Sequence, residues 1–175
     1  NTCLDIINKL RDTMTSHERV SVVEVMGRHC GDIALYSGIA SGAEIIVVPE
    51  IAFDMNEIIG RINRSRANGK HSNIIVVAEG VMSADQFAKQ LQSVTSYSVR
   101  PTCIGHVQRG GSPTMADRML AAQLGNKAVR LLKEGIGNRA VGIRDNKIID
   151  MDIIEAVSMK KTFNRELYET LQMIS

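Results

Sequence analysis

The chain has 175 residues, of which 44% are hydrophobic and 23% are charged, and its formal net charge is +2. This length suits a domain with a substantial core, and the near-neutral charge excludes general electrostatic attraction to nucleic acid or to an anionic membrane. Aromatic residues make up only 3%, which also excludes a stacking surface for single-stranded nucleic acid. Three cysteines form no CxxC pair, and no stretch is apolar enough to span a bilayer. We therefore expect a cytoplasmic globular protein with free thiols.

The chain begins without a starter Met in an amphipathic helical pattern over residues 3–10, which suggests a fragment of a longer protein. Beyond it, β-branched apolar runs alternate with helical patterns, which is typical of βαβ units. The expected parallel strands are 20–26, 45–48, 74–78 and 99–104, and helices follow them from about 32, 54, 83 and 114.

Pairs of polar residues three apart mark the starts of several of these helices. Asp54 with Glu57 and Ser83 with Gln86 predict capping boxes, and Asp152 caps a short helix. Segments 140–143 and 148–151 predict a hairpin, and a last helix starts near residue 164. We expect one α/β segment over residues 1–175: a three-layer sandwich with a mainly parallel sheet flanked by helices, and a small carboxyl-terminal hairpin with helices.

Polar or flexible residues follow each of the four expected strands, at 26–32, 49–50, 79–80 and 105–113. In parallel sheets, ligands bind outside the carboxyl ends of the strands. The sequence therefore predicts a polar site along one edge of the sheet.

The loop of residues 105–113 carries the strongest functional signal. Its glycines let the backbone approach a ligand closely, and the helix expected from Thr114 would offer unpaired N–H groups and a positive dipole end. His106 adds a hydrogen-bond donor, and Arg109 adds a charged fork suited to phosphate oxygens. We favour phosphate binding over a turn with a solvated arginine, and the segment lacks the repeats typical of RGG-type RNA binding.

Other polar residues have two interpretations each. Arg28 is either a second anion donor or a surface residue, and Glu79 either binds sugar hydroxyls or pairs with an arginine. Arg100 is either solvated at a sheet edge or reaches a ligand or a neighbouring subunit. The basic residues Arg61, Arg64, Arg66 and Lys70 fit a solvated helix face better than a binding patch.

The chain lacks the motifs by which other folds bind nucleotides. It has no GxxxxGK[ST] loop, no dinucleotide fingerprint, no zinc-ligand spacing and no acidic pair suited to Mg²⁺ beside a nucleotide. Phosphoryl transfer requires the donor phosphates and the metal in place. The sequence therefore indicates only the acceptor side of such a reaction.

Four segments together resemble the bacterial 6-phosphofructokinases. They are His17-Glu18-Arg19, the run Val22–Asp32, Val47-Val48-Pro49-Glu50 and Gly105–Pro113, and their order and spacing also match. The resemblance covers essentially the whole chain, but the upstream GGDG nucleotide loop and the TIDND segment with the catalytic aspartate are absent. The chain therefore resembles only the carboxyl-terminal half of the family.

The resemblance implies an activity and site residues. The family transfers the γ-phosphoryl group of MgATP to the 1-hydroxyl of fructose 6-phosphate in glycolysis. Met26, Gly27 and Arg28 would line the reacting end, where Arg28 would stabilise charge on the transferring group. Glu79 would bind sugar hydroxyls, and His106 and Arg109 would hold the 6-phosphate. Arg19 and Arg100 would complete the phosphate site of an adjacent subunit in a homotetramer.

The resemblance also implies an effector site for ADP or phosphoenolpyruvate. Arg11, Glu44 and Lys70 would form it, with backbone from the Gly42 and His71 regions. Asn68 stands where some members carry a basic residue, and Asp32 resembles the ATP-dependent rather than the pyrophosphate-dependent members. The Mg²⁺ and ATP would belong to the full-length enzyme, and we expect this segment to bind neither by itself.

Two other functions stay open at this point. The chain could belong to a pyrophosphate-dependent phosphofructokinase, or it could be a non-catalytic phosphosugar-binding module. We expect the isolated chain to be inactive, because the base and the nucleotide loop are absent.

Overall fold

The computed structural model describes residues 1–14 and 19–174, which divide into two compact units. The first unit comprises Asn1–Gly110 and the residues from Phe163 onward, and the second comprises Gly111–Thr162. The assignment of residues 1–175 to one α/β segment stays a prediction. In the described part of the chain, no helix has the length and apolarity needed to cross a bilayer.

A four-stranded parallel sheet forms the centre of the first unit, with strand order β2-β3-β1-β4. The strands are β1 (Arg19–Val25), β2 (Ile45–Val47), β3 (Asn73–Ala78) and β4 (Ser98–Cys103). Every residue of β3 is buried, as expected for an apolar parallel strand covered on both faces. Val25 lies opposite Ala78, and Glu24 lies opposite Cys103. The carboxyl ends of β1, β3 and β4 therefore meet at one edge of the sheet.

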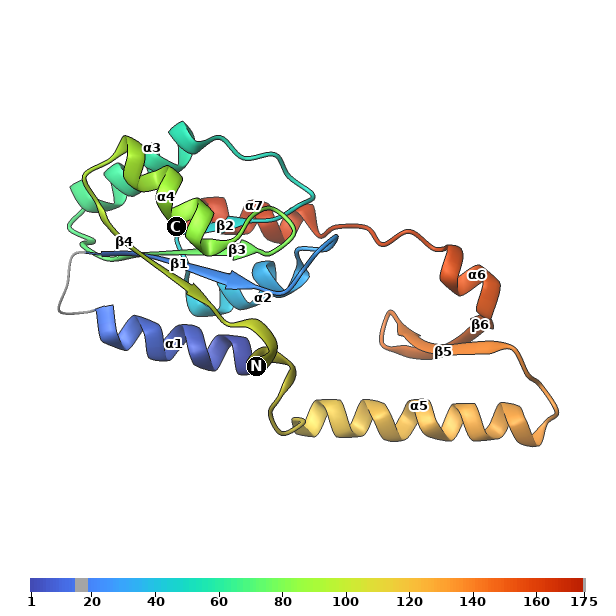
Figure 1. Cartoon of the computed structure of the whole chain (residues 1–175). Coiled ribbons are helices and arrows are strands. Elements are labelled where there is room, and N and C mark those ends of the chain that lie inside the picture. Colours follow the sequence, from blue (N-terminus) through green and yellow to red (C-terminus); the bar gives the residue numbers. More distant parts are fainter. Residues whose placement is uncertain (15–18, 175) are drawn as a thin grey trace. The chain divides into compact units, whose positions relative to one another are not determined.

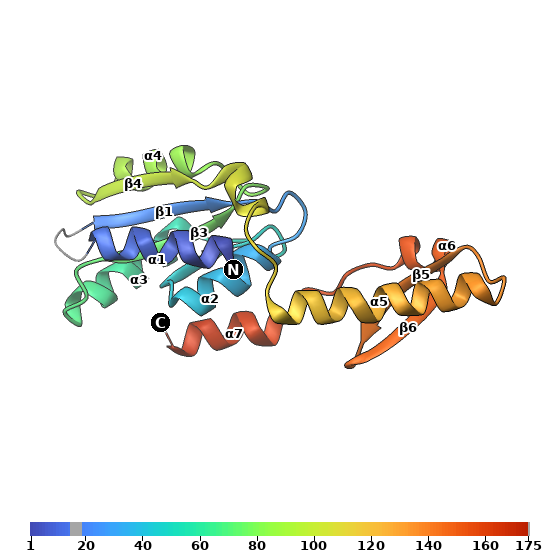
Figure 2. The same cartoon turned by 90° about the horizontal axis from the view of Figure 1, so that it is seen from below.

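Helices cover both faces of this sheet (Figure 1). They are α1 (Thr2–Met14), α2 (Asp32–Ser41), α3 (Met55–Ala67), α4 (Ala84–Val94) and α7 (Arg165–Ile174). Ile7, Leu35 and Leu171 bring α1, α2 and α7 into one core cluster. Ile62 and Phe87 bring α3 and α4 into the other. Figure 2 shows α1 and α2 on the face turned to the viewer in that orientation. The predicted fold class, a mainly parallel sheet between two helical layers, is confirmed.

The expected caps form at several helix starts, although not always in the predicted way. Ser83 and Gln86 make the reciprocal capping box at the start of α4. Asp54 accepts a hydrogen bond from the N–H of Asn56 rather than from that of Glu57, so α3 starts with a simple N-cap. The predicted capping box is wrong, because Asp54 bonds to the second residue of the helix, whereas a capping box requires a bond to the third.

The second unit consists of α5 (Met115–Lys133), the antiparallel hairpin β5 (Arg139–Arg144) and β6 (Lys147–Asp152), and α6 (Ile153–Ser158). The predicted hairpin is confirmed. Its two-residue turn places Asp145 and Asn146 at φ 49° and 58°, conformations that Asn and Asp adopt more readily than other side chains.

A charge cluster ties this hairpin to α5. Asp150 on β6 pairs with Lys127 and with Arg139, each at 2.7 Å. The hydrogen bond from Lys127, followed by that from Arg139, lowers the pKa of Asp150. The hairpin is thus joined to the helix by an electrostatic contact that requires the ionised carboxylate.

Candidate functional site

The loop after β1 forms the centre of the predicted site. Gly27 has φ 149°, and a Cβ there would lie 2.5 Å from the carbonyl oxygen of Cys30. A Cβ on Gly80, at the end of β3, would lie 1.9 Å from the carbonyl oxygen of Arg28. Two glycines therefore allow the β1 loop to fold tightly and to lie directly against the end of β3. The Arg28 side chain is exposed at this edge.

Glu79 turns toward this loop. Its Oε1 accepts a hydrogen bond from the N–H of Gly27 at 3.3 Å, and its side chain is exposed. The arginine salt bridge that we left open for Glu79 is not found among the ion pairs of the described residues. The carboxylate keeps free lone pairs beside Gly27, where hydroxyl groups of a ligand could donate to it.

The loop after β4 folds into a short 3₁₀ helix, η1 (Gly105–Arg109), which the sequence did not predict. Arg109 Nε lies 3.3 Å from Met26 Sδ, so two predicted site residues meet across the strand ends. Gln108 Oε1 accepts from the Met26 N–H at 3.0 Å. His106 is exposed on the same short helix. The structure thus brings Met26, Arg109 and His106 to one edge, as predicted.

Glu50, at the predicted polar end of β2, contributes to the same edge. Its carboxylate accepts from the Gly31 N–H at 2.8 Å and 3.1 Å. Gly31 is the N-cap residue of α2, and Glu50 accepts from its backbone N–H, as the N3 side chain does in a capping box. Glu79 and Glu50 therefore hold the two ends of the loop that carries Arg28.

The amino terminus of α5 differs from the expectation. Thr114 and Asp117 form a capping box, with the Thr114 N–H 2.8 Å from Asp117 Oδ2. Hydrogen bonds from the Thr114 hydroxyl, then from its N–H, lower the pKa of Asp117, so a carboxylate occupies the first turn. The unpaired N–H groups predicted there for phosphate binding are partly used by the helix itself, and α5 belongs to the second unit.

Arg19 and Arg100 lie away from this edge. Arg19 opens β1, and Arg100 pairs in register with Ser21 in the first half of β4. The chain therefore does not bring them to its own Met26 and Arg109, and their role in another subunit stays a prediction. His17 and Glu18 of the same motif lie outside the described residues.

Cys103 lies beneath the polar edge, beside Glu24. The thiol is 3.5 Å from Glu24 Oε1, and Glu24 Oε2 accepts from the Ala84 N–H at 2.8 Å. Partial desolvation, followed by the charge and hydrogen bond of Glu24, raises the pKa of Cys103. The thiol is therefore protonated at neutral pH, which lowers its reactivity.

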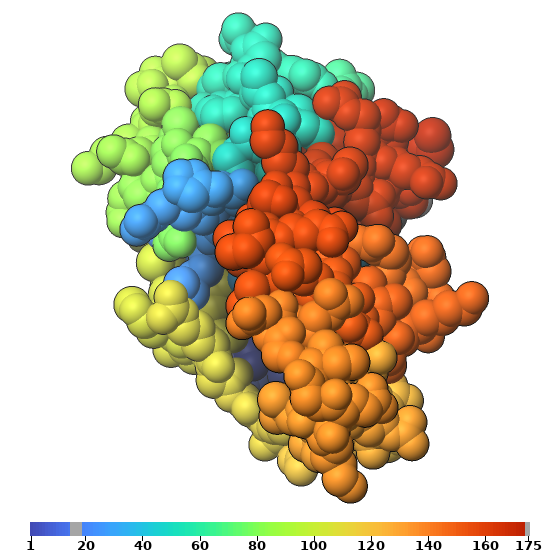
Figure 3. Space-filling view, turned by 90° about the vertical axis from the view of Figure 1, so that its right-hand side faces the viewer, coloured from blue at the N-terminus to red at the C-terminus, as the bar shows by residue number. Residues whose placement is uncertain are grey.

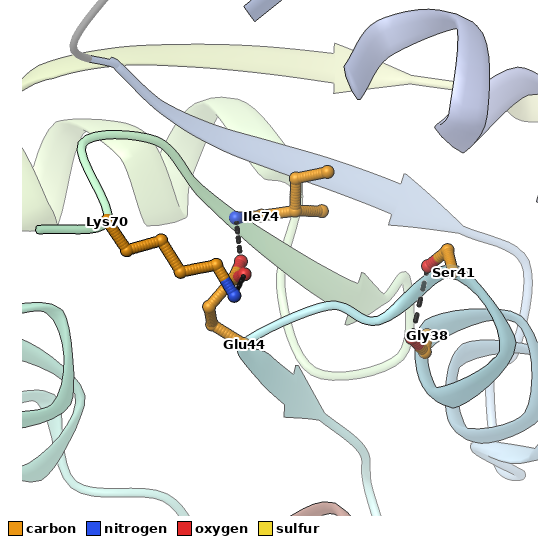
Figure 4. Close-up of polar contacts among 5 residues, drawn as sticks. All are labelled: Gly38, Ser41, Glu44, Lys70 and Ile74. Atoms are coloured by element: carbon orange, nitrogen blue, oxygen red, sulfur yellow. Dashed lines mark hydrogen bonds and ion pairs between the residues drawn. The ribbon is translucent and has the colours of Figure 1, made fainter. Parts of the chain in front are cut away.

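Two of the predicted effector residues, Glu44 and Lys70, form a second polar group near the amino ends of β2 and β3. Glu44 is only 7% exposed, and it pairs with Lys70 at 2.5 Å while accepting from the Ile74 N–H (Figure 4). A buried carboxylate requires such partners. Arg11 lies next to Gly42, since a Cβ there would be 3.5 Å from Arg11 Nη1.

A cavity of about 480 Å³ opens beside Glu44 and Lys70. The other residues around it are Glu57, Arg61, Arg64, Ser65, Asn68 and Gln172. The space-filling view shows α7, in red, beside the cyan residues at the start of α3 (Figure 3). Arg61 and Arg64 thus line a cavity, whereas the sequence alone favours a solvated helix face for them. The two arginines are three residues apart, and together with Glu57 they lie on one side of the helix. This spacing is the sequence signal that all three could line one cavity.

No group of three or more His, Cys, Asp or Glu side chains that could hold a metal ion occurs in the described ranges.

A parallel sheet whose strand ends carry glycines, arginines and glutamates is typical of α/β proteins that bind phosphorylated small molecules. Comparison with known proteins narrows this class. The chain belongs to the phosphofructokinase family, whose model, described as Phosphofructokinase, matches residues 1–132. The family resemblance drawn from the sequence is confirmed.

Curated relatives match along the entire chain. An ATP-dependent 6-phosphofructokinase of Clostridium acetobutylicum is 54% identical, and ATP-dependent 6-phosphofructokinase 1 of Clostridium perfringens is 55% identical, both over all 175 residues. In each case the chain covers 55% of the relative. The chain thus spans about half the length of the curated relatives it matches.

Solved structures agree. The phosphofructokinase of Saccharomyces cerevisiae superposes with a TM-score of 0.83 at 32% identity, over 99% of this chain and 24% of that one. A pyrophosphate-dependent phosphofructokinase of Nitrosospira multiformis has a TM-score of 0.71 at 21% identity, over 87% of this chain and 44% of that one. The latter likeness supports the fold alone.

Proposed function

We propose that this chain is the fructose 6-phosphate-binding half of an ATP-dependent 6-phosphofructokinase, a cytoplasmic enzyme of glycolysis. The observation that supports this most directly is the meeting of the β1 loop, Glu79 and Arg109 at one sheet edge. The curated relatives above are named ATP-dependent 6-phosphofructokinases, which favours ATP over pyrophosphate as the donor and an enzyme over a non-catalytic module.

The proposed roles follow from the chemistry of each side chain. Arg109 and His106 bind the 6-phosphate, because a guanidinium and an imidazole both donate to phosphate oxygens. Glu79 accepts from sugar hydroxyls. Arg28, on the loop with Met26 and Gly27, neutralises charge that develops on the transferring phosphoryl group. ATP with Mg²⁺ is supplied by another part of the whole protein, as is the base that activates the 1-hydroxyl.

Arg19 and Arg100 are proposed to act across a subunit interface of a homotetramer, where they add charge to the phosphate site of the adjacent subunit. Arg11, Glu44 and Lys70 are proposed to bind ADP or phosphoenolpyruvate. Two nitrogens of Arg11, Nε and Nη2, are buried without a hydrogen-bond partner among the described residues, which suits a group that an anion would satisfy.

Arg109→Ala in the whole protein tests the substrate assignment. The variant should raise the KM for fructose 6-phosphate by about ten- to a hundredfold, because charged hydrogen bonds contribute about 1.5–3 kcal/mol, and the KM for ATP should stay unchanged. Arg165→Ala, which alters an exposed arginine on α7, serves as the control. A loss mainly in apparent ATP affinity would contradict the assignment. The isolated 175-residue chain should show no turnover, and measurable activity would refute the half-enzyme proposal.

A further inference from the structure

Gln108 occupies an unusual place among the residues of η1. It lies between His106 and Arg109, yet its side chain is partly buried whereas theirs are exposed. Its side-chain amide makes two hydrogen bonds to backbone groups, one to Gly105 in its own turn and one to Met26, which follows β1. A polar side chain with both heteroatoms engaged by the backbone contributes to the shape of a site.

The first bond crosses between segments 82 residues apart. Gln108 Oε1 accepts from the N–H of Met26 at 3.0 Å. The backbone pairing of β1 with the β4 segment reaches Ile104, whose N–H donates to the Glu24 carbonyl at 3.1 Å. Gln108 Oε1 provides the next acceptor, for the N–H of Met26. Its side chain therefore extends the contact between the ends of β1 and β4 to the loop that carries Arg28.

The second bond stabilises the turn itself. Gln108 Nε2 donates to the Gly105 carbonyl at 2.7 Å, which closes the short helix from within. A 3₁₀ helix of this length has weak internal hydrogen bonding, and Gly105 enters it with φ 58°. The side-chain bond therefore compensates for backbone bonds that so short a helix cannot make.

We propose that Gln108 is a positioning residue that fixes η1 against the end of β1. It holds Arg109 and His106 at a set distance from the Met26–Arg28 loop, so that one bound sugar phosphate can reach both groups. The contact of Arg109 Nε with Met26 Sδ crosses the same junction, but sulfur is a weak acceptor and cannot fix the geometry alone. This inference rests on the proposed function for the identity of the ligand, but the contact itself does not depend on it.

The test uses Gln108→Met in the whole protein, because Met matches the length of Gln and removes both hydrogen bonds. We expect the KM for fructose 6-phosphate to rise about tenfold, since two ordinary hydrogen bonds are lost, while the KM for ATP is unchanged. Gln92→Met is the matched control: Gln92 Nε2 also donates to a backbone carbonyl, that of Val99 at 3.4 Å, but remote from the carboxyl strand ends. An unchanged KM for fructose 6-phosphate, or an equal rise for both substrates, overturns the proposal.

Amide hydrogen exchange provides a readout that does not depend on activity. Gln108→Met should accelerate exchange of the Met26 amide in the whole protein and leave the buried Val76 amide unchanged. Gln108→Glu keeps an acceptor for the Met26 N–H and should restore its protection. Unchanged Met26 exchange in Gln108→Met overturns the positioning role. Accelerated exchange in a protein that does not bind fructose 6-phosphate would instead refute the proposed function and leave the contact established.

Discussion

Gly80→Ala should displace the loop that carries Arg28. The new Cβ would meet the Arg28 carbonyl oxygen at 1.9 Å, whereas real Cβ atoms essentially never approach closer than 3.0 Å, so the two must separate by about 1.1 Å. The backbone fixes the position of the new Cβ, and the atom it meets is a backbone oxygen, so no side-chain rotation can relieve the clash. The shift would break the hydrogen bond from the Gly80 N–H to the Gly27 carbonyl and weaken that from the Gly27 N–H to Glu79.

Loss of the first bond and weakening of the second should destabilise the fold by about 0.5–3 kcal/mol, because each bond contributes about 0.5–1.5 kcal/mol. Displacing Arg28 by about an ångström should lower kcat of the whole protein by up to about a hundredfold. Urea unfolding followed by circular dichroism measures the first effect, and steady-state kinetics measures the second. Gly60→Ala is the control: its nearest neighbour, Arg64 Nη1, is at 3.6 Å, and alanine in a helix should stabilise. Wild-type stability and kcat in Gly80→Ala would refute this reasoning.

Three further predictions concern other parts of the chain. Glu24→Gln should accelerate alkylation of Cys103 by iodoacetamide at mildly alkaline pH, because the pKa of the thiol falls once the neighbouring charge is removed; an unchanged rate contradicts this. Since the pKa of Asp150 is lowered in the folded state, its contribution is present above the ordinary value of 3.8 and is lost as pH falls below it. Asp150→Asn should therefore lower the thermal midpoint at neutral pH but not in strong acid, and equal losses at both would count against the contact with Lys127. Ser83→Ala should lower the free energy of unfolding by about 0.5–2 kcal/mol, and a urea titration that shows no loss would exclude a stabilising cap.

Local patterns in the sequence predicted most of the fold. The apolar runs placed each strand to within one residue at either end, because burial on both faces leaves little choice of residue type. The capping residues Ser83 and Thr114 marked the starts of α4 and α5 correctly. These signals act within a few residues, so they could be read without knowledge of the partner segments.

Contacts between distant segments could not be predicted in this way. The partner of Gln108 lies 82 residues away, and no local spacing identifies it. The 3₁₀ geometry of η1 has no local signal in the sequence either. Arg61 was assigned to a solvated face for a similar reason: its hydrogen bond to Gln172 joins segments 111 residues apart. Residues that end strands, such as Glu79 and Arg109, could be proposed for the site from the sequence, whereas the contact made by Gln108 could not.

The interruption of the first unit bears on how the protein is made. Its core is completed by α7, where Leu171 is 1% exposed and Phe163 and Leu167 pack against the same cluster, but the intervening chain belongs to the second unit. During synthesis, one face of the sheet therefore stays partly uncovered until the second unit and α7 have left the ribosome. Products of premature termination would present that apolar face to chaperones and proteases. The position of one short helix thus leaves chains that lack it open to recognition by chaperones and proteases.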